Sequence, residues 1–323
     1  VMDVDSFWQM LEQSALQQPL LAVVVLLFSR FAPLPASYQP WFFIRAVANA
    51  IRAKVAKPSN DRQQQYLAGT LATLVMLVPF AVLLIAFEQL SAWPEFFQAF
   101  LLYLSLDWQF YANQIRQVSQ SIEKQQTSLA RDQLSSLVLR KTDKLSDAGI
   151  AKAALDATAF RLSKHWFGVL FWYLVGGGIA ACCYRLLLEL QQQWNPKLLR
   201  QREFGFFVSI VERVFSAVPL LGNTLLLALW VNIRDTLTFH KYSQDRQLSF
   251  TSRWLLSAWA AALKCSVAGP IYYGNEKVPR VRIGPDTQPT AAHLLKALTI
   301  ATQLQRVAIL LVFGLVALRV AAL

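Results

Sequence analysis

The sequence has few charged residues for its length, and this scarcity excludes an ordinary soluble domain. Of the 323 residues only 15% are Asp, Glu, Lys or Arg, whereas 55% are hydrophobic. Soluble domains average about 25% charged residues, so the composition predicts an integral membrane protein. The ten Trp and nine Tyr residues agree with this prediction, because these side chains gather where a membrane meets water.

Cysteine and histidine are scarce as well, and their positions offer no framework for a disulfide or a metal. Two of the three cysteines, Cys182 and Cys183, are adjacent within an apolar run, which is neither a disulfide pattern nor a zinc-binding spacing. The three histidines are His165, His240 and His293, which lie far apart and share no helix face. The sequence therefore predicts no metal site.

Long apolar runs are plentiful instead. Residues 66–87 contain no charge and exceed the about 20 apolar residues that a spanning helix needs. Pro79 within this run should kink the helix rather than end it, because neighbouring helices can satisfy the freed carbonyl. Residues 166–188 and 307–323 are two further runs. Arg185 lies near the end of the first of these, so we expect its long side chain to reach the membrane surface.

Three weaker runs complete the membrane prediction. They cover residues 16–32, 94–111 and 214–233, of which the first is short and the second carries Asp107. We expect an all-α, polytopic integral membrane protein with about six transmembrane helices, forming a single membrane domain over 1–323. The glycines at 176–178 lie inside a predicted span, where small residues permit close helix packing, so we do not interpret them as a phosphate-binding loop.

Lysine and arginine alternate between absent and abundant along the chain. None occurs in the first nineteen residues or in 88–93 and three occur in 189–207, whereas 33–65 contains five, 112–165 nine and 234–306 ten. Cytoplasmic connections carry the excess of these residues. The pattern predicts three cytoplasmic segments and two periplasmic termini in a bacterial inner (cytoplasmic) membrane. It also explains the net charge of +12 as a topology signal, so the lipid bilayer, and not nucleic acid, is the expected partner.

Two of the cytoplasmic segments read as helical. Residues 41–57 place Phe42 and Val55 in an apolar stripe, with cations such as Arg45 on the other faces, which is typical of an amphipathic helix at a membrane surface. Residues 112–165 repeat apolar positions at three and four spacing on both sides of a polar turn, LRKTDKL. We predict a helical hairpin there, with Ser146 as the N-cap of its second helix.

The third cytoplasmic segment contains a different kind of stretch, SVAGPIYYGNEKVPRVRIG, at residues 266–284. Glycine and proline at these positions favour tight turns. Arg280 and Arg282 supply planar cations that can grip a carboxylate or phosphate with two parallel hydrogen bonds. The glycines of this loop are Gly269, Gly274 and Gly284.

Several fragments, in order along nearly the whole chain, resemble one protein family. The loop carries remnants of a Gly-Gly-Pro…Tyr…Gly…Pro…Ile-Gly pattern, and Arg140 with Thr142 is similar to a Gly-Arg-Asp-Thr motif. LFWYLVGGG…YR resembles a Pro-Leu-Phe…Gly-Gly…Tyr-Lys span, and Phe204, Gly205 and Pro219 fit a later Phe-Gly…Pro segment. These are patterns of the CobD/CbiB family of cobalamin-biosynthesis membrane proteins, which the chain resembles.

The resemblance implies adenosylcobinamide-phosphate synthesis, in which a phosphorylated aminopropanol is joined to a corrinoid carboxylate as an amide. It implies ATP and Mg²⁺ as cofactors if this activity is retained, and a corrinoid or other anionic small molecule as ligand. A homo-oligomer stays open, and no catalytic residue can be assigned. The candidate ligand-binding residues are Arg140, Thr142, Asp156, Tyr273, Arg280 and Arg282, with the three loop glycines beside them.

The chain departs from the family where acids are expected. A Glu…Glu-Asn…Asp-Gly pattern stands here as DATAFRLSKH, in which only Asp156 keeps an acid and Phe160 and Lys164 replace polar or acidic positions. Lys141 likewise replaces the Asp of the Gly-Arg-Asp motif. Phenylalanine cannot bind Mg²⁺, and lysine repels it. We therefore expect a divergent homologue without synthase activity; were it active, it would be an amide ligase of the cobinamide-phosphate synthase type.

Two alternatives remain open. The phrase AFRLSKHWFGVLFWYLVGGG resembles AmpE-like membrane proteins, which are linked to signalling for β-lactamase induction and are distantly similar to the CobD/CbiB family. A small-molecule transporter is the third reading, because charges inside a membrane are costly. The charges in question, such as Arg30, Asp107 and Arg213, lie near predicted span ends, and no inverted repeat is visible.

The alternation of Lys and Arg yields a testable topology. Single cysteines at Ser128 and Gln244 should react with an impermeant thiol reagent only after the inner membrane is permeabilised, because both lie in cation-rich segments. Cysteines at Gln18 and Gln192 should react without permeabilisation. Labelling of position 244 in intact cells would contradict the six-span arrangement.

Overall fold

A computed structural model describes residues 14–35, 38–57, 61–198, 201–243, 247–273 and 276–321. Gly274 and Gln244 lie outside these ranges. The chain divides into two compact units, and each is described by itself. The first unit comprises the described residues of Val1–Asp107, Gly168–Phe215 and Gln305–Leu323, and the second those of Trp108–Phe167 and Ser216–Leu304.

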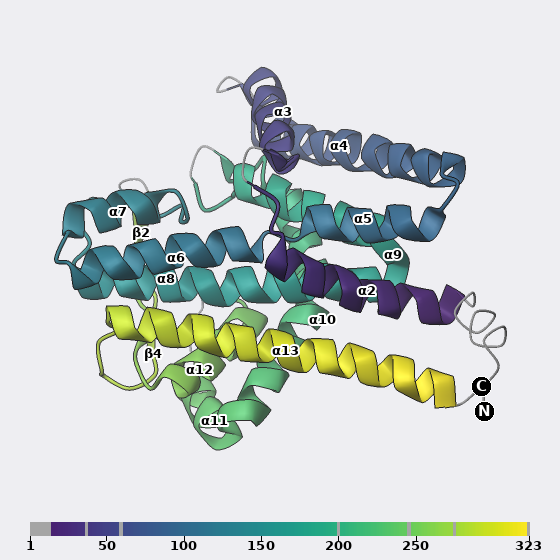
Figure 1. Cartoon of the computed structure of the whole chain (residues 1–323). Helices are drawn as coiled ribbons and strands as arrows, with labels where there is room; N and C mark the ends of the chain where they lie inside the picture. The colour runs from purple at the N-terminus through teal and green to yellow at the C-terminus, as the bar shows by residue number, and fades with distance from the viewer. Residues whose placement is uncertain are drawn as a thin grey trace. The chain divides into compact units, whose positions relative to one another are not determined.

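The first unit is built from helices alone among its described residues (Figure 1). Its own helices are α2 (Ser14–Phe31), α3 (Trp41–Val55), α4 (Arg62–Leu90), α5 (Pro94–Ser105) and α9 (Val169–Gln193). It also includes the first part of α10 (Phe206–Val231) and the last part of α13 (Ala291–Ala321). A π-helical turn, Leu162–Gly168, joins α8 to α9 without a loop.

The second unit contains the predicted helical hairpin and the glycine-rich loop. Its own helices are α6 (Trp108–Glu123), α7 (Thr127–Ser135), α8 (Asp147–Arg161), α11 (Ile233–Tyr242) and α12 (Phe250–Leu263). The loop folds into four short strands, β1 (Val267–Ala268), β2 (Ile271–Tyr273), β3 (Glu276–Val278) and β4 (Arg282–Ile283). The outer pair, β1 with β4, and the inner pair, β2 with β3, are both antiparallel. Strands of two or three residues are too short to show an alternating pattern in sequence.

Four helices are long and apolar enough to cross a membrane, at Arg62–Leu90, Asp147–Gln193, Phe206–Val231 and Ala291–Leu318. A shorter apolar helix covers Gln17–Phe31. The all-α membrane fold is thus confirmed, whereas the count of six crossings stays a prediction. The expectation of one helix over 94–111 is wrong, because α5 ends at Ser105 and α6 begins at Trp108.

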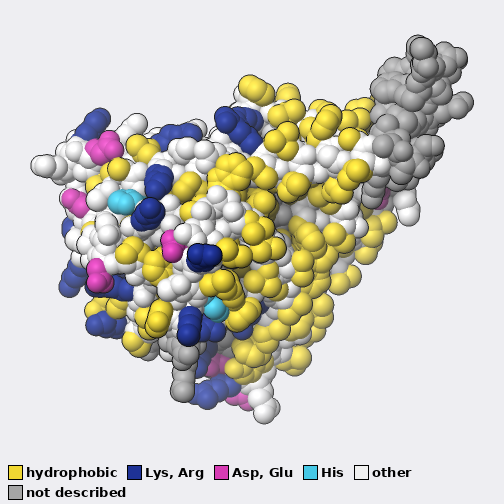
Figure 2. Space-filling model, turned by 90° about the horizontal axis from the view of Figure 1, so that it is seen from below, with side chains coloured by type: hydrophobic (Ala, Val, Ile, Leu, Met, Phe, Trp, Pro, Cys, Tyr) yellow, Lys and Arg dark blue, Asp and Glu magenta, His cyan; other side chains and the backbone are white. Residues whose placement is uncertain are grey.

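Helix α4 exposes apolar side chains on most of its surface, and such a surface requires contact with hydrocarbon. Only 17% of its most apolar window is buried, and Leu71, Val75 and Val82 are each more than half exposed. Hydrophobic side chains also gather elsewhere, on the surface that Figure 2 shows from below. A helix that is apolar on every face is stable only inside a protein core or a membrane, so α4 faces lipid. It continues through Pro79, as predicted.

The glycines of α9 let two helices of the first unit approach closely. A Cβ on Gly178 would lie 2.3 Å from the backbone oxygen of Gln98 in α5, which is far inside contact distance. The prediction that these glycines serve packing is therefore confirmed. The same stretch also interrupts the helix, because Gly176 and Gly177 have non-helical dihedral angles.

A buried network of charges holds the first unit together. Arg185 is fully buried and its Nη2 donates to Asp107 Oδ2 at 2.7 Å and to Glu189 Oε1 at 2.6 Å. Arg45 donates to the same Glu189 through Nε at 2.6 Å and Nη2 at 3.1 Å. The Arg185 guanidinium also lies 5.3 Å from the ring centre of Trp41. Two cations thus meet two carboxylates.

The network corrects two sequence predictions. Arg185 does not extend to the membrane surface, because Asp107 and Glu189 neutralise it in the interior. Helix α3 forms as predicted, but its inward face differs from the predicted stripe. Trp41 is buried and Arg45 pairs with Glu189, whereas Phe42 is 51% exposed.

Replacing Arg185 should cost more stability than replacing an exposed arginine. Arg185→Ala leaves Asp107 and Glu189 as buried charges without their shared partner, and breaking such a pair costs about 3–5 kcal/mol. We expect a clearly lower melting temperature for the purified protein in detergent. Arg306→Ala, an exposed position in α13, is the matched control and should melt like the parent. Equal melting of both variants would contradict a stabilising role for the network.

Candidate functional site

Helix α8 positions two charged side chains of the second unit on one face. Its start is fixed by Ser146, whose hydroxyl accepts a hydrogen bond from the backbone of Gly149 at 3.3 Å, so the predicted N-cap is confirmed. From that start, Lys152 and Asp156 stand four residues apart and project from the same side of the helix.

Asp156 connects three segments of the second unit. Its carboxylate is buried and accepts a hydrogen bond from Arg140 Nη2 at 3.4 Å and another from the backbone N–H of Ala268 in β1 at 3.0 Å. Ala268 has a φ of +58°, a conformation that costs about 1 kcal/mol or more for a residue with a side chain. The hydrogen bond to Asp156 helps to hold Ala268 in this conformation.

The LRKTDKL turn docks on the strand pair that follows. The backbone N–H of Lys141 donates to the carbonyl of Tyr272 in β2 at 3.1 Å. Inside the turn, the N–H of Leu145 donates to the carbonyl of Thr142 at 3.0 Å, and Thr142 is buried. The turn that carries Arg140 and the strands that flank Arg280 are therefore neighbours, although more than a hundred residues separate them.

Arg140 and Arg280 lie close enough for their charges to interact. Burial lowers the pKa of the Arg140 guanidinium, Asp156 opposes this shift, and the neighbouring charge of Arg280 lowers the pKa further. Burial also raises the pKa of the Tyr273 hydroxyl, while Arg280 and Arg140 act in the opposite direction. Arg140, Tyr273 and Arg280 thus form one cluster with Asp156.

Gly269 brings two more cations to this cluster. Its φ is +102°, and a Cβ there would lie 3.3 Å from Arg282 Cγ and 3.9 Å from Lys152 Cδ. Lys152 also interacts electrostatically with Arg282 and Asp156. Our reading of the sequence missed Lys152. The signal was its four-residue spacing from Asp156 on a predicted helix.

The structure also places the remaining candidates. Gly284, with a φ of +103°, packs where an added Cβ would lie 2.8 Å from Ala260 in α12, so it serves the docking of the loop. Thr142 belongs to the same turn as Arg140, and its side chain is buried. Its hydroxyl forms no hydrogen bond with the described candidate residues. Gly274 lies outside the described part of the chain.

We call Arg140, Lys152, Asp156, Tyr273, Arg280 and Arg282 the Asp156 cluster. It contains four cations and a single carboxylate. Within the part of the chain that the structure describes, Arg280 Nε and Nη2 are buried and have no hydrogen-bond partner. Buried donors normally have partners, and a carboxylate or phosphate matches the planar fork of arginine. The arrangement is suited to binding an anion.

Arg161 of α8 and Lys164 of the π-helical turn lie against aromatic rings. Arg161 Cζ lies 5.2 Å from the ring centre of Tyr111, and Lys164 Nζ lies 5.7 Å from that of Phe160. Such contacts stabilise a cation on a ring face and offer no ligand to a metal. No group of three or more His, Cys, Asp or Glu side chains among the described residues could hold a metal ion.

The chain is similar to one known protein family and to several known proteins. Residues 22–301 match the family model described as CobD/Cbib protein. The chain is 27% identical over 198 residues to the cobalamin biosynthesis protein CobD of Stutzerimonas stutzeri, a match that covers 61% of this chain and 65% of that protein. It is 24% identical over 283 residues to the CobD of Chromobacterium violaceum, covering 87% and 91%.

A third relative, the CobD of Brucella suis, is 28% identical over 174 residues, or 52% of this chain and 53% of that protein. The match thus covers 65% of the Stutzerimonas stutzeri protein and 53% of the Brucella suis protein, and 91% of the Chromobacterium violaceum protein. No solved structure matches.

Proposed function

The chain belongs to the CobD/CbiB family, and from this premise we propose that it is a membrane protein of cobalamin biosynthesis that binds an anionic ligand at the Asp156 cluster. The family match over residues 22–301 supports the pathway. The observation that carries the binding role is that the Asp156 cluster contains four cations and one carboxylate, and that Arg280 Nε and Nη2 are buried without a hydrogen-bond partner among the described residues.

The expected ligand carries a phosphate or a carboxylate. Arg280, Arg282 and Arg140 can each present two parallel N–H groups to such an anion, which a lysine cannot do. The Tyr273 hydroxyl, kept protonated because burial raises its pKa, adds a neutral donor. An anionic intermediate of corrinoid synthesis fits this set of donors, and the relatives are named for cobalamin biosynthesis.

The cluster does not fit the magnesium ion that the family's amide synthesis implies. Mg²⁺ requires an octahedral shell of oxygen ligands, usually with one or two carboxylates. Asp156 already accepts hydrogen bonds from Arg140 and Ala268, and the surrounding cations repel a divalent ion. The phosphates of a nucleotide would suit the arginines, but their metal would have no ligands here. We therefore propose that this chain does not make the amide.

A second candidate function follows from the region where α8 runs into α9. Arg161 and Lys164 rest on aromatic rings there, in the phrase that resembles AmpE-like proteins. These side chains support a signalling or regulatory protein without synthase activity, in which the Asp156 cluster binds an anion as a sensor. In both candidates the cluster lies on the cytoplasmic side, as the distribution of Lys and Arg predicts.

The first test asks whether the chain can replace a synthase. Expressed in a strain that lacks its corrinoid synthase, the chain should not restore growth on cobyric acid, because the acids that would hold the metal are absent. The strain's own synthase on the same vector is the positive control, and an epitope tag should confirm membrane insertion. Growth equal to that control would contradict the proposed loss of activity.

The second test asks whether the cluster binds an anion through arginine geometry. Arg280→Lys preserves the charge, the topology and the attraction to lipid phosphates but removes the two-pronged donor. Binding of inorganic pyrophosphate, measured by calorimetry on the purified protein, should weaken about tenfold, which corresponds to about 1.4 kcal/mol.

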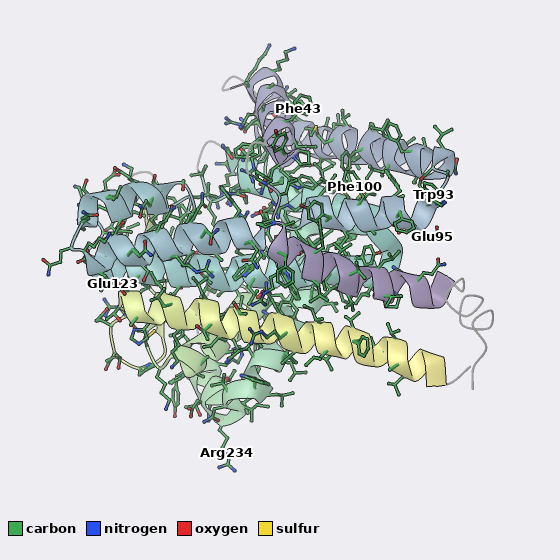
Figure 3. All side chains as sticks on the ribbon, viewed as in Figure 1. Phe43, Trp93, Glu95, Phe100, Glu123 and Arg234 are labelled. Atoms are coloured by element: carbon green, nitrogen blue, oxygen red, sulfur yellow. The ribbon has the colours of Figure 1, made fainter. Side chains whose placement is uncertain are left out.

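Arg234→Lys is the matched control, since Arg234 is an exposed arginine on α11 (Figure 3) and should not affect binding. If Arg280→Lys and Arg234→Lys both bind pyrophosphate like the parent, or if the parent does not bind it, the arginines act only on lipid phosphates and the proposed site is wrong.

A further inference from the structure

The first unit contains a cavity that the family resemblance does not predict. Its volume is about 310 Å³, and it opens among four helices. Gln18 and Leu21 come from α2, Glu88 from the end of α4, Glu95 and Gln98 from the start of α5, and Tyr173, Val175 and Gly177 from α9. Figure 3 labels Glu95 at the amino-terminal end of α5, beside Trp93.

An interruption of α9 forms one wall of the cavity. Gly177 has a φ of +73° and a ψ of −169°, so the helix is broken at this residue. This positive φ is one that residues with a side chain rarely adopt, so glycine is favoured here. The sequence at Gly177 thus allows the helix to be interrupted at this point.

Two glutamines replace the hydrogen bonds that the break removes from α9. In an unbroken helix the carbonyl of Tyr173 would accept from the N–H of Gly177, and the N–H of Gly178 would donate to the residue four earlier. Instead the side chain of Gln18 donates to the Tyr173 carbonyl, and Gly178 N–H donates to Gln98 Oε1 at 2.7 Å. Polar side chains thus satisfy the interrupted backbone inside an apolar unit.

The charge of the cavity lining has one sign. Glu88 and Glu95 are the two carboxylates among its described lining residues, and none of these described residues is a cation. Glu88 accepts a hydrogen bond from the side-chain amide of Gln98, and neither carboxylate forms an ion pair with another described residue. Leu21, Pro94 and Val175 supply apolar wall.

From this lining we propose that the cavity binds a small organic cation, an ammonium group on a short aliphatic body. The carboxylates of Glu88 and Glu95 pair with the ammonium group, and the apolar side chains of the lining contact the aliphatic body of the ligand. We expect a ligand without an anionic group, because no cation lies among the lining residues that the structure describes. This site is independent of the Asp156 cluster, which has charge of the opposite sign, and it does not rest on the function proposed above.

The test uses putrescine, a four-carbon diamine, titrated by calorimetry into the full chain in nanodiscs of uncharged lipid. Putrescine should bind saturably, whereas butanediol, its neutral counterpart, should not bind. Glu88→Gln and Glu95→Gln should each weaken putrescine binding severalfold, and the double variant should abolish it. Glu123→Gln, an exposed carboxylate on α6, is the matched control and should bind like the parent.

A second variant separates the cavity from its charge. Leu21→Trp keeps both carboxylates but fills the space, so it should also weaken putrescine binding while the protein melts near the parent temperature. The proposal is overturned if the parent shows no saturation at millimolar putrescine, or if butanediol binds equally. It is also overturned if the double Gln variant binds like the parent, or if Na⁺ or Mg²⁺ saturates the site and putrescine does not.

Discussion

A charge removed from water must meet an opposite charge, and the two units of this protein treat that constraint differently. In the first unit, Arg185 and Arg45 face Asp107 and Glu189, so the two positive and two negative charges balance. A balanced buried network stabilises the fold and leaves no net charge for a ligand to neutralise. Asp107, which pairs with Arg185, lies between the end of α5 and the start of α6.

In the second unit the charges do not balance. Asp156 is the single carboxylate in a cluster with four cations. Its two oxygens accept hydrogen bonds from Arg140 and from the backbone N–H of Ala268. The excess positive charge has to be met by solvent, by lipid or by an anionic ligand. This excess charge and the buried N–H groups of Arg280 are the features on which the proposed binding site rests.

Much of the fold was predictable from sequence, because a membrane-spanning helix can be recognised by the length and hydropathy of its apolar run. The predicted spans 66–87 and 214–233 fall on α4 and α10, although α10 begins eight residues earlier than predicted. The Ser146 cap and the close packing at 176–178 also follow from local rules. The fate of Arg185 did not, because its partners lie four residues and 78 residues away and no local rule selects the distant one. A lone Asp in an apolar run could have raised the question.

Most residues of the candidate site could be predicted from the sequence, whereas their arrangement in space could not. Charge and family resemblance picked out Arg140, Asp156 and Arg280, which the structure brings into one cluster. Lys152 was missed because a lysine on a predicted helix is ordinarily a solvated residue. The cavity beside Gly177 was missed because its lining comes from four helices, and a sequence read in order cannot show which helices surround a break.

The hydrogen bond between Asp156 and Ala268 changes how this acid should be interpreted in divergent proteins. An aspartate that holds a strained backbone residue in place is needed for folding whatever chemistry takes place beside it. A requirement for a stable fold is therefore enough to explain why an aspartate stands at this position. Its presence is, by itself, no evidence that a reaction takes place beside it.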